Sequence, residues 1–176
     1  MGSLTRRPWA VLALLAMAGA HGMLRAAEPL EYAVKAAYLS KFPFYVEWPA
    51  SAFTGLNSPI TLCVAGEDPF GSALDEAVTG QQVQGHAIVV RRLRSVTRES
   101  GCHIVYIAGD ARVEHLRGSN ALVVTDGPSP GAIISFVLKD NKVRFNVDDD
   151  AAAQNGLTIS SKLLSVALAV KPRGVR

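Results

Sequence analysis

The sequence predicts one α/β domain built as a three-layer sandwich around a mixed, mostly parallel sheet, and two observations support this. Short apolar runs of strand length alternate with helical segments through the middle of the chain, which is the pattern of parallel βαβ units. The last two apolar runs are separated only by Asp140 and Asn141, a hairpin signal. We therefore expect the sheet to end in an antiparallel hairpin, followed by a closing helix.

The elements are expected in a defined order. Residues 31–42 carry apolar side chains at helical spacing and end at Pro43. Asp68 is a good N-cap with Pro69 at the first helical position, and Ser160 is a good N-cap for the closing helix. Strands are expected over residues 60–65, 87–93, 102–108, 121–125, 133–138 and 142–147. Helices are expected over residues 31–42, 69–78, 110–116, 151–155 and 161–170, with a short helix or turn at 95–100 and a loose basic tail.

The N-terminus has the three parts of a secretory signal peptide. Arg6 and Arg7 precede an eleven-residue apolar run over residues 10–20, and small residues follow. This run is too short for the roughly 30 Å hydrocarbon core, which disfavours a membrane anchor. We expect cleavage between residues 20 and 27, one soluble domain over residues 28–176, and a periplasmic location in a Gram-negative source.

Charge argues against a nucleic-acid partner. The full chain has a formal net charge of +3, but all 15 acidic residues lie at or beyond Glu28 while Arg6, Arg7 and Arg25 precede it. The mature chain therefore holds 15 basic and 15 acidic residues, or one more basic residue if the cut is at Ala20. Bulk basicity, the electrostatic mark of nucleic-acid binding, belongs to the leader.

The mature chain has two cysteines, Cys63 and Cys102. In an oxidising compartment an isolated pair usually forms a disulfide, although two buried thiols are an alternative. If the first strand lies between the second and third, as in doubly wound sheets, the two cysteines become lateral neighbours on adjacent strands. The disulfide and the topology therefore support each other.

Catalytic and cofactor motifs are missing from the sequence. The turn at residues 66–71 places two carboxylates where a phosphate-binding loop would need none, so a structural cap is the better interpretation. His86, His103 and His115 have no metal-site spacing, and the aspartates at 148–150 lack the pattern of a calcium loop. We expect no enzyme, no cofactor and no metal.

Two clusters remain as candidate surfaces. The basic cluster of Arg91, Arg92, Arg94 and Arg98 fits either a solvated strand end or an acidic partner. The aromatic group of Phe42, Phe44, Tyr45 and Trp48 fits either the core or an interaction patch.

Five stretches resemble the motifs of one family, the YfiR-like periplasmic proteins, in the same order along the mature chain. They are residues 34–49, which resemble its "vKAAyLynFakfveWP" opening, and then residues 66–71, 131–136, 143–147 and 156–164. The resemblance implies a non-catalytic, homodimeric regulator that represses the periplasmic sensor domain of an inner-membrane diguanylate cyclase, YfiN. A YfiB-like outer-membrane lipoprotein relieves the repression. Cyclic di-GMP and biofilm formation rise when the repression is lost.

The resemblance also implies roles for particular residues. Cys63 and Cys102 match the cysteine pair that holds the family fold together, whereas residues 127–135 lack the second pair of the best-known member. Partner contacts are expected on the last strand and the closing helix, at Arg144, Phe145, Asn146, Val147, Leu163 and Leu164. A periplasmic small-ligand binding module is the alternative function, and a secreted hydrolase is third.

Overall fold

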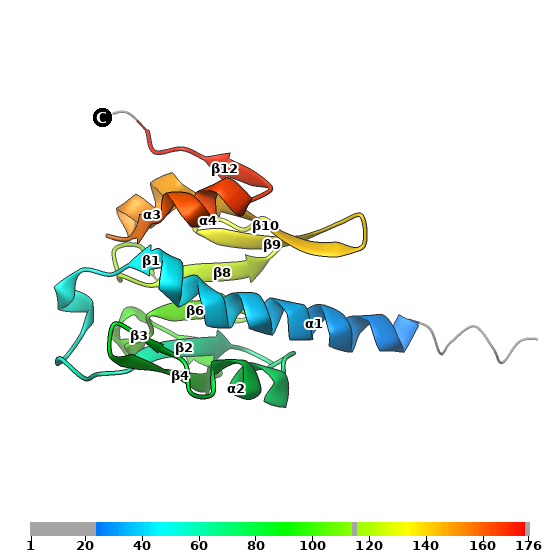
Figure 1. The fold of residues 1–176 in the computed structure, drawn as a ribbon, viewed down its shortest axis with the longest axis horizontal. Helices are drawn as coiled ribbons and strands as arrows, with labels where there is room; N and C mark the ends of the chain where they lie inside the picture. The colour runs from blue at the N-terminus through cyan, green and yellow to red at the C-terminus, as the bar shows by residue number, and fades with distance from the viewer. Residues whose placement is uncertain (1–23, 114–115, 175–176) are drawn as a thin grey trace, which may run out of the picture.

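A computed structural model describes residues 24–113 and 116–174, and an eight-stranded sheet forms its centre (Figure 1). The strand order is β12-β10-β9-β8-β6-β2-β4-β3. Strand β10 is antiparallel to β9, and β3 is antiparallel to β4, while every other neighbouring pair is parallel. The predicted mixed, mostly parallel sheet with a C-terminal hairpin is confirmed. The strands are β2 (Ile60–Ala65), β3 (Gln82–Val83), β4 (His86–Leu93), β6 (Ile104–Ile107), β8 (Leu122–Asp126), β9 (Ile134–Lys139), β10 (Lys142–Asp148) and β12 (Ala169–Lys171).

Helix α1 (Leu24–Lys41) lies across the first face of the sheet and extends beyond the ends of the strands, on the same side as the tip of the β9–β10 hairpin (Figure 1). Helix α2 (Ser72–Val78) packs beside it. Along each central strand every second side chain points to this face, as the two-residue period of a strand requires. The main core therefore lies between α1, α2 and the sheet, and its largest fully buried members are Leu39, Phe42, Ile60, Leu62, Leu74, Ile104, Tyr106, Leu122, Ile133, Ile134, Phe136 and Leu157.

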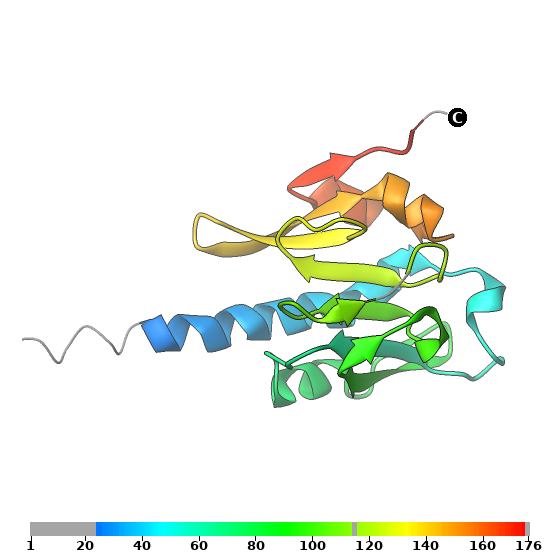
Figure 2. The same cartoon turned by 180° about the vertical axis from the view of Figure 1, so that it is seen from behind.

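The second face of the sheet is covered by short segments (Figure 2). These are β5 (Ser95–Val96), the 3-10 helix η3 (Arg98–Ser100) and β7 (Arg112–Val113), which pairs with β5. They close a smaller second core around Cys63, Val96, Val105 and Val123. This layer completes a three-layer arrangement in which the two covering layers differ in thickness.

The remaining elements of the described residues are two 3-10 helices, two short strands and two helices. They are the 3-10 helices η1 (Phe42–Tyr45) and η2 (Ala50–Ala52), the short paired strands β1 (Val46–Glu47) and β11 (Thr158–Ile159), and helices α3 (Asp149–Gln154) and α4 (Ser161–Val166). Among the helices of the described residues, none combines the length and the apolar character that a membrane span needs.

Three local predictions are confirmed. Asp140 and Asn141 both adopt left-handed backbone conformations, with φ of 51° and 57°, as a two-residue hairpin turn requires. The Asp148 side chain accepts a hydrogen bond from Ala151 N at 2.8 Å and caps α3. Ser160 caps α4 in the same way.

The predicted start of the second helix at Pro69 is wrong, because α2 begins at Ser72. The Asp68 carboxylate accepts a hydrogen bond from Phe70 N at 2.8 Å and pairs with Arg92 at 2.6 Å. It therefore stabilises the turn before the helix instead of the first helical turn. Gly71, with φ of 54°, occupies the N-cap position.

Two other helix predictions are wrong in part. Within the expected helix at 110–116, Arg112 and Val113 form strand β7, and residues 114–115 lie outside the described part of the chain. The closing helix ends at Val166 instead of residue 170, because residues 169–171 pair with β10 as strand β12. The basic tail is also anchored, since Lys171 pairs with Asp148 and Arg173 pairs with Asp149.

Candidate functional site

The disulfide joins the sheet to the layer that covers its second face. Cys63 lies in the middle of β2 and is fully buried, and its Cα lies 5.8 Å from that of Cys102. The expected geometry is wrong in one respect, because the residue beside Cys63 on β6 is Val105. Cys102 precedes β6 and approaches Cys63 from the segment after η3. The pairing is as predicted, but it links layers instead of adjacent strands.

The residues expected to contact a partner divide between the core and the surface. On β10, Phe145 and Val147 are each 2% exposed and pack in the main core, whereas Arg144 and Asn146 point to the opposite face. On α4, Leu163 is buried and Leu164 is half-buried. Of the six expected residues, only Arg144, Asn146 and Leu164 are at least partly exposed, while Phe145, Val147 and Leu163 belong to the core.

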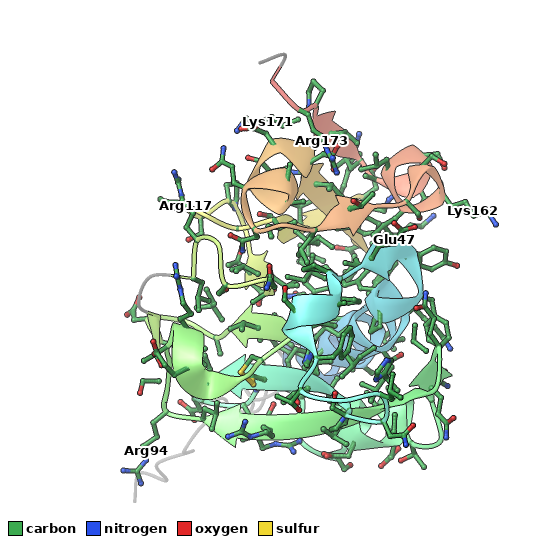
Figure 3. The ribbon with its side chains drawn as sticks, turned by 90° about the vertical axis from the view of Figure 1, so that its left-hand side faces the viewer. Glu47, Arg94, Arg117, Lys162, Lys171 and Arg173 are labelled. Carbon is green, nitrogen blue, oxygen red and sulfur yellow. A yellow bond between two sulfur atoms is a disulfide. The ribbon has the colours of Figure 1, made fainter. Side chains whose placement is uncertain are left out.

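Exposed apolar side chains lie on α4 and on the neighbouring η1, and of these the sequence did not single out Val166. Helix α4 packs against η1, and Ser160 N donates a hydrogen bond to Tyr45 O at 2.9 Å. Phe44 and Tyr45 of η1 are 44% and 37% exposed, and Val166 of α4 is 57% exposed. We call Phe44, Tyr45, Leu164 and Val166 the η1–α4 patch. Lys162 projects from the same helix into solvent (Figure 3).

The predicted aromatic group therefore splits between two roles. Phe42 is 1% exposed and stacks on Phe136 with a centroid distance of 5.9 Å, so it belongs to the core. Phe44 and Tyr45 belong to the surface. Trp48 lies between these extremes, with its ring edge-on to His103 at 6.2 Å. Pro43 at the start of η1 interrupts the helical pattern, which is why neighbouring aromatic residues face different ways.

A charge cluster around the buried Lys35 lies at the carboxyl ends of the parallel strands, which is the usual place for a ligand in open α/β sheets. Lys35 of α1 is only 4% exposed, and its Nζ lies 2.5 Å from Glu31 and 2.9 Å from Asp126. Tyr106 and Tyr32 donate hydrogen bonds to Asp126 at 2.6 and 3.3 Å. The sequence contained no signal for this cluster, because its members come from three separate elements.

The cluster changes the proton affinity of its members. Burial alone would lower the pKa of Lys35, but hydrogen bonds to Glu31 and Asp126 outweigh it and raise that pKa. Burial raises the pKa of the Tyr106 hydroxyl, and the Asp126 carboxylate raises it further. Every polar group here has a partner within the described residues, so the cluster connects α1 to the sheet through ion pairs and hydrogen bonds.

The cluster borders a cleft of about 670 Å³ lined by the loops after β2 and β6. Its charged walls are the carboxylates of Glu67, Asp68, Asp110 and Asp126. Within the described ranges, no three side chains among His, Cys, Asp and Glu gather at metal-binding distance. His103 is buried, and its Nδ1 accepts a hydrogen bond from Thr61 N, while His115 lies outside the described residues.

Comparison with known proteins places the chain in a family. A family model described as YfiR/HmsC-like matches residues 32–168. The chain belongs to the YfiR/HmsC-like family. The matched region contains the whole sheet up to the start of β12, both cysteines and the η1–α4 patch. A search of curated proteins found no match.

Family membership indicates a YfiR-type regulator of a diguanylate cyclase, from a family of generally non-catalytic regulators. The disulfide between Cys63 and Cys102 is consistent with the oxidising periplasm. The family model does not identify the partner of this particular chain.

Proposed function

We propose that this protein is a periplasmic repressor that binds the periplasmic sensor domain of a YfiN-like, inner-membrane diguanylate cyclase. As a homodimer it lowers cyclic di-GMP and biofilm formation, and a YfiB-like outer-membrane lipoprotein sequesters it to relieve the repression. The match of residues 32–168 to the YfiR/HmsC-like family carries this proposal. The signal peptide expected before residue 28 would deliver the domain to the compartment where such sensor domains lie.

Repression in this proposal requires only a difference in affinity. A protein that binds the inactive arrangement of the sensor domain more tightly than the active one shifts the population toward the inactive state. A tenfold preference supplies about 1.4 kcal/mol of that shift. A rigid domain with a disulfide between its layers suits this role, because it can hold one arrangement of its partner without changing shape itself.

The η1–α4 patch is the proposed contact surface on this chain. It combines exposed aromatic and aliphatic side chains, and aromatic residues dominate the energetics of many interfaces. Exposed large apolar side chains gathered on neighbouring elements are typical of protein interaction sites. It contains Leu164 and adjoins Leu163, two of the residues expected from the family resemblance.

Deleting the gene tests the proposal, with cyclic di-GMP measured by mass spectrometry and biofilm measured by dye retention. We expect both to rise, and to return to normal on complementation with the wild-type gene. The Val166→Glu variant should fail to complement and should lose at least roughly tenfold in affinity for the purified sensor domain. Leu56→Glu is the matched control, because Leu56 is 94% exposed on a distant loop. Unchanged cyclic di-GMP on deletion, together with no binding, would refute the proposal.

The alternative of a small-ligand binding module rests on the cleft at the carboxyl edge of the sheet. It predicts a rise in melting temperature on addition of a periplasmic metabolite, in proportion to the logarithm of its concentration. It also predicts that Tyr32→Ala in the cleft wall removes that rise, while Val166→Glu leaves it unchanged.

A further inference from the structure

Strand β4 has an open outer edge. Strand β3 pairs only with its first two residues, Ala87 and His86. Strand β2 pairs with it on the inner side from Ile88 to Leu93. After Ile88, whose N–H donates to Gln81 O at 3.1 Å, the outer side of β4 has no strand partner within the described residues.

The direction of the free main-chain groups follows from the ladder. Leu93 O accepts a hydrogen bond from Gly66 N at 2.9 Å on the inner side, whereas the N–H of Ile88 points to the outer side. Main-chain groups alternate between the two sides along a strand of a parallel sheet. Val90 and Arg92 therefore direct their N–H and C=O groups outward, where an added strand can pair with them.

Two arginines of the cluster expected from the sequence lie on this strand or directly after it, namely Arg91 within β4 and Arg94 just beyond Leu93. Arg92 also lies on β4, but it pairs with Asp68 and Asp75 on the first face, each at 2.6 Å. Among the described residues, no ion pair within 4.0 Å involves Arg91, Arg94, Arg98 or Arg117, unlike Arg92 (Figure 3 shows Arg94 and Arg117). The cluster expected from the sequence thus loses Arg92, and Arg98 directs its guanidinium to the main chain of Arg117, which lies apart from Arg94 (Figure 3).

Two of these guanidinium groups are held in position by the main chain. Arg91 donates to Ser100 O at 2.8 Å, and Arg98 donates to Arg117 O at 2.6 Å. Each retains further N–H donors, and a guanidinium in a fixed position is suited to binding a carboxylate with two parallel hydrogen bonds. Val89, on the same face as Arg91, is 37% exposed and offers an apolar contact between the charges.

We propose that the outer edge of β4 binds an extended, acidic segment of a protein partner as an added strand. Main-chain pairing to Val90 and Arg92 supplies affinity, and the arginines select for carboxylates on alternate residues of the segment. A second copy of this chain is disfavoured at this edge, because pairing two β4 strands brings like charges together. The proposal does not depend on a cyclase as the partner.

A peptide experiment tests this site with the mature protein. The probe is a capped seven-residue peptide of alternating Glu and Val, and the matched control peptide has Lys in place of Glu. We expect only the acidic peptide to bind, and to slow hydrogen exchange at the Val90 and Arg92 amides. The triple variant Arg91→Glu, Arg94→Glu, Arg98→Glu should weaken binding at least roughly tenfold. Lys162→Glu is the charge-reversal control and should bind normally.

A proline variant separates strand addition from simple charge attraction. Val90→Pro removes an N–H that lies outside the native ladder, and proline is tolerated at such edge positions. Folding of each variant is checked by circular dichroism and its melting curve. A folded Val90→Pro that binds the acidic peptide as tightly as wild type overturns the proposal. So does binding without protection of the two amides, or protection that rises with protein concentration when no peptide is present.

Discussion

The disulfide gives the most direct test of how this fold is held together. Replacing both Cys63 and Cys102 by alanine leaves the buried site apolar, so the variant removes the covalent link without burying a new polar group. The two residues are separated by 39 positions in the chain. Loop-closure entropy for a loop of this size corresponds to about 4 kcal/mol at 25 °C.

The assay is urea unfolding followed by circular dichroism, with a thermal melt on the same samples. We expect the free energy of unfolding of the double variant to fall by about 4 kcal/mol, and its melting temperature to fall by roughly 8–16 °C. Adding a reductant to the urea titration should destabilise the wild type to a similar extent, because the bridge becomes accessible as the chain unfolds, and should not affect the double variant. A double variant within about 1 kcal/mol of the wild type would show that the link does not restrain the unfolded chain, and would refute the reasoning.

Two further predictions concern the charge cluster and a tight turn. The free energy of unfolding should fall as pH rises above about 10, because the pKa of Lys35 is raised in the folded state. The stability that Lys35 contributes is fully present below the pKa of lysine in the unfolded chain, and it is lost as pH rises through the folded pKa. Tyr106 acts in the same direction, because its raised pKa keeps the hydroxyl neutral in the folded state while tyrosine in the unfolded chain ionises. The double variant Lys35→Met, Tyr106→Phe should therefore show a weaker dependence of the free energy of unfolding on pH above about 10. Gly66→Ala should cost more than about 2 kcal/mol in urea unfolding, because φ is +93° and a Cβ would lie 2.8 Å from Ala111 Cβ. Gly80→Ala, with φ of +70° and open space around it, should cost only about 1 kcal/mol, and equal costs would contradict this account.

Local signals in the sequence predicted much of the sheet. The run of apolar residues in β2 reflects a strand buried on both faces, and all six of its residues are buried. The hairpin followed from Asp140 and Asn141, whose side chains tolerate positive φ. The caps at Asp148 and Ser160 depend on residues only three positions away, so they too could be inferred from the sequence.

The errors arose where a distant element decided the outcome. Residues 169–171 continue an apolar helical pattern, but Leu168 N donates to Phe145 O and the chain then pairs with β10. Arg112 and Val113 pair with Ser95 and Val96 in the same way. Periodicity describes one segment at a time and contains no information about a free strand edge elsewhere. The charge cluster around Lys35 could not be predicted for the same reason, because its members come from three elements that are separate in the sequence.

The burial of Cys63 has a consequence for how the bridge responds to thiols. Exchange requires a thiolate to attack one of the two sulfurs, and Cys63 is fully enclosed while Cys102 is half-buried. Attack on the Cys102 sulfur would expel Cys63 as a thiolate into the apolar second core, where a charged leaving group is poorly solvated. We therefore expect exchange to be slow unless the covering segment opens first. Once oxidised, this disulfide would persist for the lifetime of the folded molecule. A rapid response to small thiols would therefore have to use a group other than this disulfide.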